Sequence, residues 1–366
     1  MRQLWLVVLA ASACGFHRGS PLQTGDGQPA SDVAIADTTR SIDAPADGPP
    51  DAPGWAYKRQ ITINNAGLSA LTDFPVLVVL DSTRIRYSST GADLRFTDTT
   101  GATQLAYEIE TWNPAGSSYV WVKIPTIAAG TTTTFWMLYA NPAAVDAQMP
   151  TAVWDASFAG VWHLVDAHDS TGKNTSTNNG ATATTGQIGG AMAFDGATGH
   201  NIDTGYNTNL TRWTIEAWGK PTNAAALGSV ATAWVARFPN YLMLWDCYIN
   251  GYCHTLLYNY NNGMSTASVG YTATTGAWSY LAGSYDGATL RSIVNGSATN
   301  SVANTNTPSG AASSAKIGEQ DASQPAILGS IDEVRISTIA RSADWITATY
   351  KTATGAYLTY GAEQPN

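Results

Sequence analysis

Pairs of carboxylates are the residues of this chain whose spacing could do chemistry. Glu108 and Glu110 are separated by one residue in a predicted strand, so they share a face with Cα atoms about 7 Å apart. Glycoside hydrolysis uses two carboxylates about 5–5.5 Å or about 6.5–9.5 Å apart, which makes the pair a catalytic candidate. The alternating residues Tyr107, Ile109 and Thr111 are the ones expected to face the core. We therefore expect Glu108 and Glu110 on a solvated face, without a catalytic role.

The remaining acidic residues offer no second candidate pair. Asp332 and Glu333 are neighbours in a predicted strand, which places them on opposite faces, and Glu216 stands alone on its strand. His163 and His168 are not spaced to share a strand face and have no cysteine nearby, which argues against zinc. The sequence shows no nucleophile elbow and no Gly-rich loop that leads into a helix. It therefore predicts a protein that is not an enzyme.

A segment crowded with aromatic and amide side chains is the candidate binding site. It surrounds Cys247 and Cys253, which flank a loop at 249–251 and would lie opposite each other in a hairpin, within disulfide reach. Aromatic faces and amides together suit a polyhydroxylated ligand. The candidate ligand-binding residues are Trp245, Tyr248, Tyr252, Tyr258, Tyr260 and Asn262. The alternatives are aromatic side chains packed in the core and two free thiols. Glu216 and Trp218 share a strand face and are a further candidate for lining the concave side of the same sheet.

The first residues predict export and a lipid anchor. Residues 1–14 have the pattern of a signal peptide, and Ala11-Ser12-Ala13-Cys14 resembles a lipobox, whose cysteine is acylated after cleavage. Acylation of Cys14 leaves the other two of the three cysteines as a pair. The alternative is an ordinary cleaved secretion signal. Residues 15–53, rich in Asp, Pro and Ala, are expected to form a disordered acidic linker. We expect a bacterial cell-envelope protein, at the outer membrane or cell surface, held to the membrane only by lipid.

The rest of the chain has the texture of an all-β protein. Of the 366 residues only 12% are charged, and the net charge of −9 argues against nucleic acid as a partner. Short segments rich in β-branched and aromatic residues alternate with turn residues, which indicates antiparallel β-sandwiches. We place one at 54–150 and a second at 151–366. Asp286-Gly287 and Asn295-Gly296 supply the positive φ angles of two tight turns.

One short helix is expected near the end of the chain. Ser342 is placed to cap a helix that runs to Tyr350, with Trp345 and Ile346 turned inward.

The first block resembles an uncharacterised bacterial domain family that occurs beside LamG domains and beside MotA/TolQ/ExbB-type proton-channel domains. The stretches that carry the resemblance lie at 55–63, 71–78, 92–98, 107–113, 120–125 and 139–142. Because the function of that family is unknown, the resemblance implies an architecture and a context only.

The second block resembles a LamG, concanavalin A-like jelly roll. The stretches that carry this resemblance lie at 161–164, 169–172, 188–196, 214–218, 278–296 and 329–337. The resemblance implies a two-sheet fold that binds glycans or proteins, in some members with a structural Ca²⁺. Asp332 is the first candidate ligand for calcium, followed by Asp169 and Asp195; the alternatives are an arginine partner for Asp332 and turn-forming roles for the other two. The Glu-x-Asp-x-x-Glu motif of jelly-roll glucanases is missing.

These observations favour a non-catalytic surface lipoprotein that binds an extracellular carbohydrate or protein through its LamG-like block. A hydrolase or lyase acting on polysaccharides and a structural component of envelope assembly are the alternatives.

Overall fold

β-Strands make up most of the described chain, as predicted. The structure, a computed structural model, describes residues 54–222, 233–237, 244–248, 252–259, 263–269, 274–305, 313–320 and 325–366. Between residues 244 and 269, and at residues 298 and 299, it describes the backbone alone. All described residues fall in one compact unit, Pro45–Asn366. Within this unit the predicted order, a β-sandwich followed by a concanavalin A-like jelly roll, is confirmed.

The first sandwich is built from two antiparallel sheets. One sheet has the strand order β22-β1-β6-β3 and the other has the order β2-β5-β4. The strands are β1 (Tyr57–Asn64), β2 (Leu71–Leu80), β3 (Arg95–Thr97), β4 (Tyr107–Thr111), β5 (Ser118–Ile127), β6 (Thr132–Tyr139) and β22 (Leu358–Pro365).

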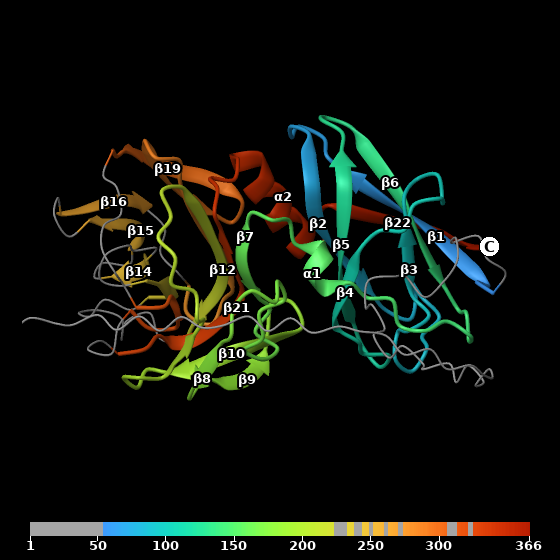
Figure 1. Ribbon diagram of the computed structural model, residues 1–366, viewed down its shortest axis with the longest axis horizontal. Coiled ribbons are helices and arrows are strands. Elements are labelled where there is room, and N and C mark those ends of the chain that lie inside the picture. Colours follow the sequence, from blue (N-terminus) through green and yellow to red (C-terminus); the bar gives the residue numbers. More distant parts are fainter. Residues whose placement is uncertain are drawn as a thin grey trace, which may run out of the picture. The chain divides into compact units, whose positions relative to one another are not determined.

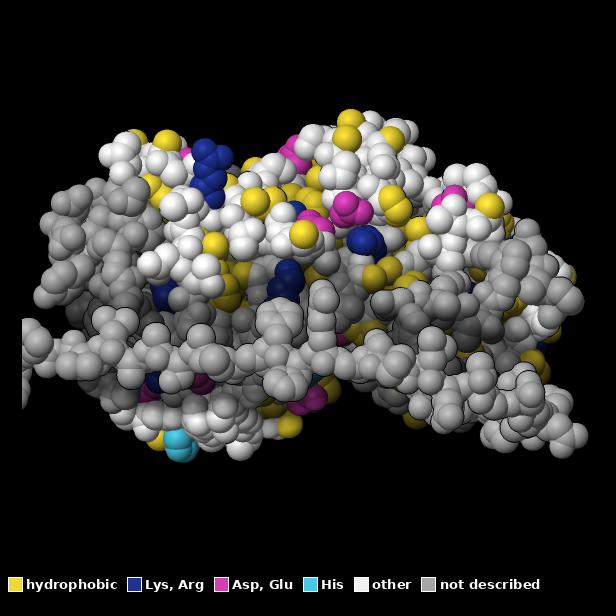
Figure 2. Space-filling model, in the orientation of Figure 1, with side chains coloured by type: hydrophobic (Ala, Val, Ile, Leu, Met, Phe, Trp, Pro, Cys, Tyr) yellow, Lys and Arg dark blue, Asp and Glu magenta, His cyan; other side chains and the backbone are white. Residues whose placement is uncertain are grey.

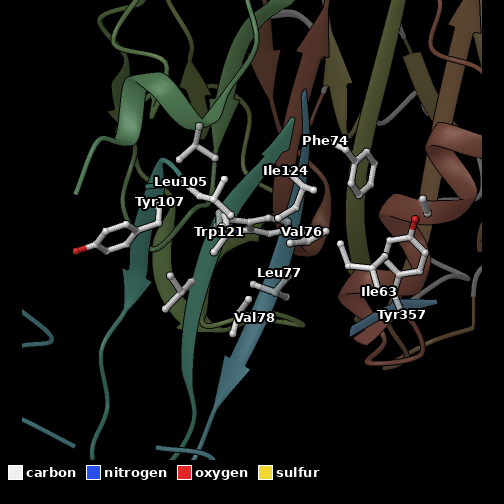
Figure 3. Packing of buried hydrophobic residues seen from close by; sticks show 14 of the residues in the cluster. Ile63, Phe74, Val76, Leu77, Val78, Leu105, Tyr107, Trp121, Ile124 and Tyr357 are labelled. Carbon is white, nitrogen blue, oxygen red and sulfur yellow. The ribbon is translucent and has the colours of Figure 1, made fainter. Parts of the chain in front are cut away.

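Apolar residues in alternation hold these two sheets together. Ile61 and Ile63 of β1 are fully buried, and so are Val76 and Val78 of β2. Figure 3 shows this packing, with residues of β2 beside Trp121 of β5. Each buried branched side chain of this size contributes about 1.5–3 kcal/mol, so the period-two pattern of these strands accounts for much of the stability of the sandwich.

The jelly roll has one large sheet and two smaller ones. The large sheet has the order β19-β18-β17-β12-β21-β10-β9, with β7 also paired to β21; the smaller sheets are β13-β20-β11-β8 and β14-β15-β16. The strands of the large sheet are β7 (Phe158–Trp162), β9 (Thr182–Thr185), β10 (Gly190–Asp195), β12 (Trp213–Pro221), β17 (Ser279–Tyr285), β18 (Thr289–Val294), β19 (Ser297–Ala303) and β21 (Leu328–Ser337). The others are β8 (Thr177–Asn179), β11 (Asn201–Asp203), β13 (Val235–Ala236), β14 (Leu244–Tyr248), β15 (Tyr252–Asn259), β16 (Gly263–Val269) and β20 (Lys316–Ile317).

The side chains on the two faces of β12 show that both faces of the large sheet are buried. Trp213, Ile215 and Ala217 face the core between the large sheet and β13-β20-β11-β8. Glu216 and Trp218 lie on the opposite face and are also buried, at 2% and 4% exposure. The large sheet is therefore covered on both faces, and the expectation that Glu216 and Trp218 line a concave binding surface is wrong. Trp218 instead stacks on Tyr350 of the C-terminal helix, with ring centroids 5.7 Å apart.

The predicted turns join the strands that the sequence indicated. Asp286-Gly287 connects β17 to β18, and Asn295-Gly296 connects β18 to β19. Asn295 and Gly296 both have positive φ, at 47° and 76°, which is the conformation that a two-residue hairpin turn needs.

Two helices accompany the strands in the described chain. Helix α1 is a single turn (Pro150–Val153), and α2 (Ala343–Ala353) begins after Ser342, whose side chain accepts a hydrogen bond from Trp345 N. Trp345 and Ile346 are buried, which confirms the predicted cap and inward face. None of the described helices is long and apolar enough to cross a membrane.

The last strand pairs with the first one. Strand β22 lies antiparallel to β1, with Ile61 opposite Tyr360 and Tyr57 opposite Pro365 (Figure 1). The block expected at 151–366 therefore ends in a strand that completes the first sandwich. Sequence order could not show this, because the strands that pair are about three hundred residues apart in the sequence.

Candidate functional site

Ionisable side chains gather in the interior, between the sheet β2-β5-β4 and the outer face of the large jelly-roll sheet. On the face of the molecule in Figure 2, charged side chains of both signs are scattered among uncharged and hydrophobic ones. The interior group, which we name the charged cluster, consists of Glu108, Glu110, His163, Glu216, Asp332, Glu333 and Arg335. Their side chains are at most 10% exposed. Charges buried this deeply must be paired or neutralised.

A β-bulge brings Asp332 and Glu333 to the same side of strand β21. In the pairing of β12 with β21, Glu216 lies opposite Arg335 but Trp218 lies opposite Asp332, so one residue of β12 faces two of β21. Glu333 has a φ of 53°, an uncommon value for a residue with a side chain. The bulge cancels the strand alternation, so the prediction that Asp332 and Glu333 point to opposite faces is wrong.

The imidazole of His163 is the centre of the charged cluster. His163 follows β7, and its Nδ1 atom lies 2.7 Å from Glu333 Oε1 and 3.6 Å from Glu110 Oε2. Its Nε2 atom lies 3.5 Å from Glu108 Oε2. The ring stacks on Trp121, with centroids 5.8 Å apart and an angle of 17° between the planes. His163 therefore joins two carboxylates of the first sandwich to one of the jelly roll.

Arg335 supplies the second cation. Its guanidinium donates to Glu333 Oε2 and lies 4.0 Å from Glu216 Oε2. The same group sits over the rings of Trp121 and Trp154, at 4.4 Å and 5.2 Å from their centroids. Cation–π contacts of this kind are worth about 2 kcal/mol or more when they are shielded from water.

The indole N–H groups of Trp121 and Trp154 donate hydrogen bonds to the carboxylates of β4. Trp121 Nε1 donates to Glu110 Oε2, and Trp154 Nε1 donates to Glu108 Oε2, each at 2.9 Å. Among the described residues, no donor hydrogen-bonds Glu110 Oε1. The same holds for Asp332 Oδ1, although Asp332 Oδ2 accepts from the backbone N–H of Ile188 at 2.9 Å.

The pKa shifts follow from burial and from the two cations. Burial raises the pKa of Glu110, Glu216 and Asp332, and the charge of Glu333 raises those of Glu110 and Asp332 further. For Glu333, burial acts in the same direction, but His163 and Arg335 outweigh it and lower the pKa.

The two remaining pKa shifts complete the charge balance. Burial opposes ionisation of Glu108, yet His163 lowers the pKa of that carboxyl, and burial of His163 is outweighed by Glu333 and Glu108, which raise its pKa. With Glu110, Glu216 and Asp332 neutral, the negative Glu108 and Glu333 balance the positive His163 and Arg335. In the fully ionised state the cluster would carry five negative and two positive charges.

This environment corrects the prediction for Glu108 and Glu110. The two side chains share a face, as expected, but that face is buried against the jelly roll and is not solvated. A polysaccharide has no access to carboxylates that are 10% and 1% exposed. Their chemistry here is to pair charge and accept hydrogen bonds.

The three predicted calcium ligands have different surroundings. The carboxylate of Asp169 accepts hydrogen bonds from Val161 N, Thr171 N and Asn174 Nδ2, so both of its oxygens already have protein donors. Asp195 is exposed and accepts from Ala197 N, as a turn residue does. Only Asp332 keeps a free, buried oxygen, but a histidine and an arginine lie within the same cluster. This donor set differs from the all-oxygen shell that Ca²⁺ prefers. Calcium binding at Asp332 stays a prediction.

The predicted aromatic hairpin exists as backbone. Strands β14 and β15 pair with Cys247 opposite Cys253, the register that the sequence predicted, and with Tyr248 opposite Tyr252. The side chains of these residues, and those of Trp245 and Tyr258, lie outside the description, and so do Tyr260, Asn262 and Cys14 altogether. The ligand-binding role, the disulfide and the lipid anchor stay predictions.

Sequence reasoning missed the members of the cluster that make it a site. His163, Arg335, Trp121 and Trp154 come from segments far apart in the chain, and none of them stands in a spaced motif. The signal that was present is local: His163 and Arg335 both fall within stretches that carry the jelly-roll resemblance, at 161–164 and 329–337.

Comparison with solved structures finds distant likenesses. Domain 4 of AbnA, a GH43 extracellular arabinanase from Geobacillus stearothermophilus in complex with arabinotriose, is 21% identical at a TM-score of 0.39, covering 53% of this chain and 98% of that one. The binding domain of botulinum neurotoxin serotype G is 14% identical at a TM-score of 0.41, covering 50% and 47%. The serotype D ligand-binding domain in complex with N-acetylneuraminic acid is 12% identical at 0.43, covering 56% and 52%. The chain thus spans about half the length of these neurotoxin domains.

Comparison with family models assigns two overlapping regions, and no curated protein matches the chain. One match crosses the boundary expected at residue 150. Residues 90–216 match a domain of unknown function, DUF2341, and residues 194–347 match the concanavalin A-like lectin/glucanases superfamily, so the chain contains a concanavalin A-like domain.

Proposed function

We propose that the protein is a non-catalytic binding protein of the bacterial cell surface, anchored by lipid at Cys14, whose jelly roll binds an extracellular carbohydrate or protein. One observation carries the proposal: the acidic residues nearest to a catalytic arrangement are buried in the charged cluster, at most 10% exposed. Each of those carboxylates lies where no polysaccharide reaches, which favours binding over hydrolysis.

The geometry of the large sheet favours a ligand site on the other side of the jelly roll. Helix α2 and the sheet β2-β5-β4 cover its outer face, where Trp218 and Tyr280 are buried, so a ligand would bind elsewhere. Strands β14, β15 and β16 form a separate sheet, and its hairpin carries the aromatic residues singled out from the sequence. A disulfide between Cys247 and Cys253 would fix the hairpin, which lowers the entropy lost on binding.

A glycan array with the full chain tests the ligand. We expect binding that is lost in the Trp245→Ala and Tyr258→Ala variants and kept in Trp136→Ala, a matched control on a strand of the first sandwich. Release of reducing sugar from the arrayed polysaccharides would overturn the proposal in favour of a hydrolase. Binding that survives both hairpin substitutions would exclude the hairpin as the site. No binding to glycans or to surface proteins would favour the role in envelope assembly.

Two chemical experiments test the anchor and the disulfide. Palmitate labelling should be present in the wild type and lost in Cys14→Ser; labelling that persists in the variant would exclude this anchor. Alkylation without reductant, followed by mass mapping, should leave Cys247 and Cys253 unmodified, and labelling of both thiols would exclude the disulfide.

A further inference from the structure

We propose that Glu110, His163 and Glu333 bind a divalent transition-metal ion of the zinc class, which joins the first sandwich to the jelly roll. Each of the three residues offers one ligand atom, and these atoms lie within 4.8 Å of one another. They come from β4, from the segment after β7 and from the bulge of β21. Imidazole nitrogen and carboxylate oxygen are ligands that zinc takes at about 2.0–2.2 Å.

The spacing of the ligand atoms fits one shared ion. Tetrahedral ligands at the zinc distance are about 3.3–3.4 Å from each other. His163 Nδ1 lies 2.7 Å from Glu333 Oε1, and the Glu110 carboxylate comes within 3.6 Å of the same nitrogen at Oε2, the oxygen beside Oε1. The shorter contact is the hydrogen bond that an ion between the two groups would replace.

An orphan oxygen is the second, independent observation. Glu110 has a side chain that is 1% exposed, and its Oε1 atom has no hydrogen-bond donor among the described residues. Asp332, which is fully buried and interacts electrostatically with Glu110, has an orphan Oδ1 as well. A buried polar oxygen without a hydrogen-bond partner is costly, and a bound cation would give it one.

Outer groups hold each of the three residues in the orientation that a ligand needs. His163 Nε2 faces Glu108 at 3.5 Å, which leaves Nδ1 for the ion in the carboxylate–histidine–metal arrangement. Trp121 holds Glu110 through Oε2, and Arg335 holds Glu333 through Oε2. Glu110 Oε1, His163 Nδ1 and Glu333 Oε1 are the atoms that remain.

Burial makes this a structural ion rather than a catalytic one. The side chains of Glu110, His163 and Glu333 are 1%, 8% and 2% exposed, so a substrate could not reach the ion. On binding, the ion would take the place of the protons on Glu110 and His163, so the net charge of the cluster would not change and the histidine would bind in its neutral form. The spacing of His163 and His168 disfavours zinc between those two histidines, whereas two of the ligands here are glutamates from distant strands.

Metal content and melting temperature of the full chain test this inference. After dialysis against a chelator, we expect one equivalent of Zn²⁺ to bind and the melting temperature to rise, because an ion that binds only the folded chain stabilises it. Co²⁺ should give the visible absorption of a tetrahedral site.

Two isosteric variants separate ligand from neighbour. Glu110→Gln should weaken Zn²⁺ affinity by more than the roughly 10- to 100-fold that outer-group changes cause. Glu216→Gln removes a buried carboxyl of the same cluster that is not a ligand, and it should keep one equivalent of zinc. A wild-type protein that binds neither Zn²⁺ nor Co²⁺ would overturn the inference, and so would equal affinity in Glu110→Gln. If Glu110→Gln does not fold, the wild-type measurements alone decide. Stabilisation by Ca²⁺ alone would also overturn it, and would support the calcium site predicted at Asp332.

Discussion

Replacing Arg335 with methionine should destabilise the protein strongly, although the two side chains are similar in length. Arg335 is 3% exposed and donates to Glu333, which is 2% exposed. The substitution leaves the Glu333 carboxylate buried with His163 as its remaining cationic partner. It also removes the guanidinium from the faces of Trp121 and Trp154.

The size of the effect follows from burial. Removing one partner of a buried ion pair costs about 3–5 kcal/mol, because the other charge stays uncompensated or must take up a proton. Arg86→Met is the matched control: Arg86 pairs with Glu363 at 2.7 Å, but its side chain is 59% exposed. Water and salt screen such a pair, so the control should leave stability unchanged.

Urea unfolding followed by tryptophan fluorescence measures both variants. The tryptophans that report on the cluster are Trp121 and Trp154, whose indoles hydrogen-bond Glu110 and Glu108. We expect a lower midpoint for Arg335→Met and the wild-type midpoint for Arg86→Met. Equal midpoints in the two variants would refute the reasoning that burial makes the ion pairs of the charged cluster contribute more to the free energy of unfolding than an exposed pair does.

One truncation and three substitutions test other parts of the fold. Ending the chain after Tyr357 removes β22 from the edge of the first sandwich and should lower the melting temperature in circular dichroism; an unchanged melt would show that the β1 pairing contributes nothing. Gly296→Ala and Gly276→Ala both place a side chain at a φ near 75°, but only at Gly296 would the Cβ meet Tyr350, at 2.8 Å. We expect Gly296→Ala to lose about 1–3 kcal/mol more than Gly276→Ala in urea unfolding, and equal losses would contradict the contact. Ser342→Ala removes the cap of α2 and should cost about 1 kcal/mol in the same assay; no loss would mean that the cap hydrogen bond is not a net gain.

Local features were predictable from the sequence because local chemistry sets them. Asn295-Gly296 forms the turn that its positive φ angles allow, and Ser342 caps α2. The register that places Cys247 opposite Cys253 follows from the length of the loop between them. In each case the residues that decide the outcome are a few positions apart.

The charged cluster was not predictable, because two of its determinants are non-local. Strand alternation fails at Glu333, since a bulge depends on the neighbouring strand and not on the residue itself. Burial of Glu108 and Glu110 depends on whether protein or solvent lies against their face of the sheet. The alternation of residues along β4 is the same in both cases, so it could not distinguish them. The pairing of β22 with β1 has the same origin.

The pairing of β22 with β1 also decides where attached segments would leave the molecule. The N–H of Asn366 donates to the carbonyl oxygen of Ala56 at 3.2 Å, so both ends of the described unit lie at the same end of the β22-β1 pair. Topologically, the jelly roll is then an insertion between β6 and β22, the two strands that flank β1 in the first sandwich. Neighbouring termini of this kind are suited to circular permutation. A mechanical force applied at residue 54 would act on the hydrogen bonds that pair β1 with β6 and β22 in the first sandwich. The jelly roll would not bear that force.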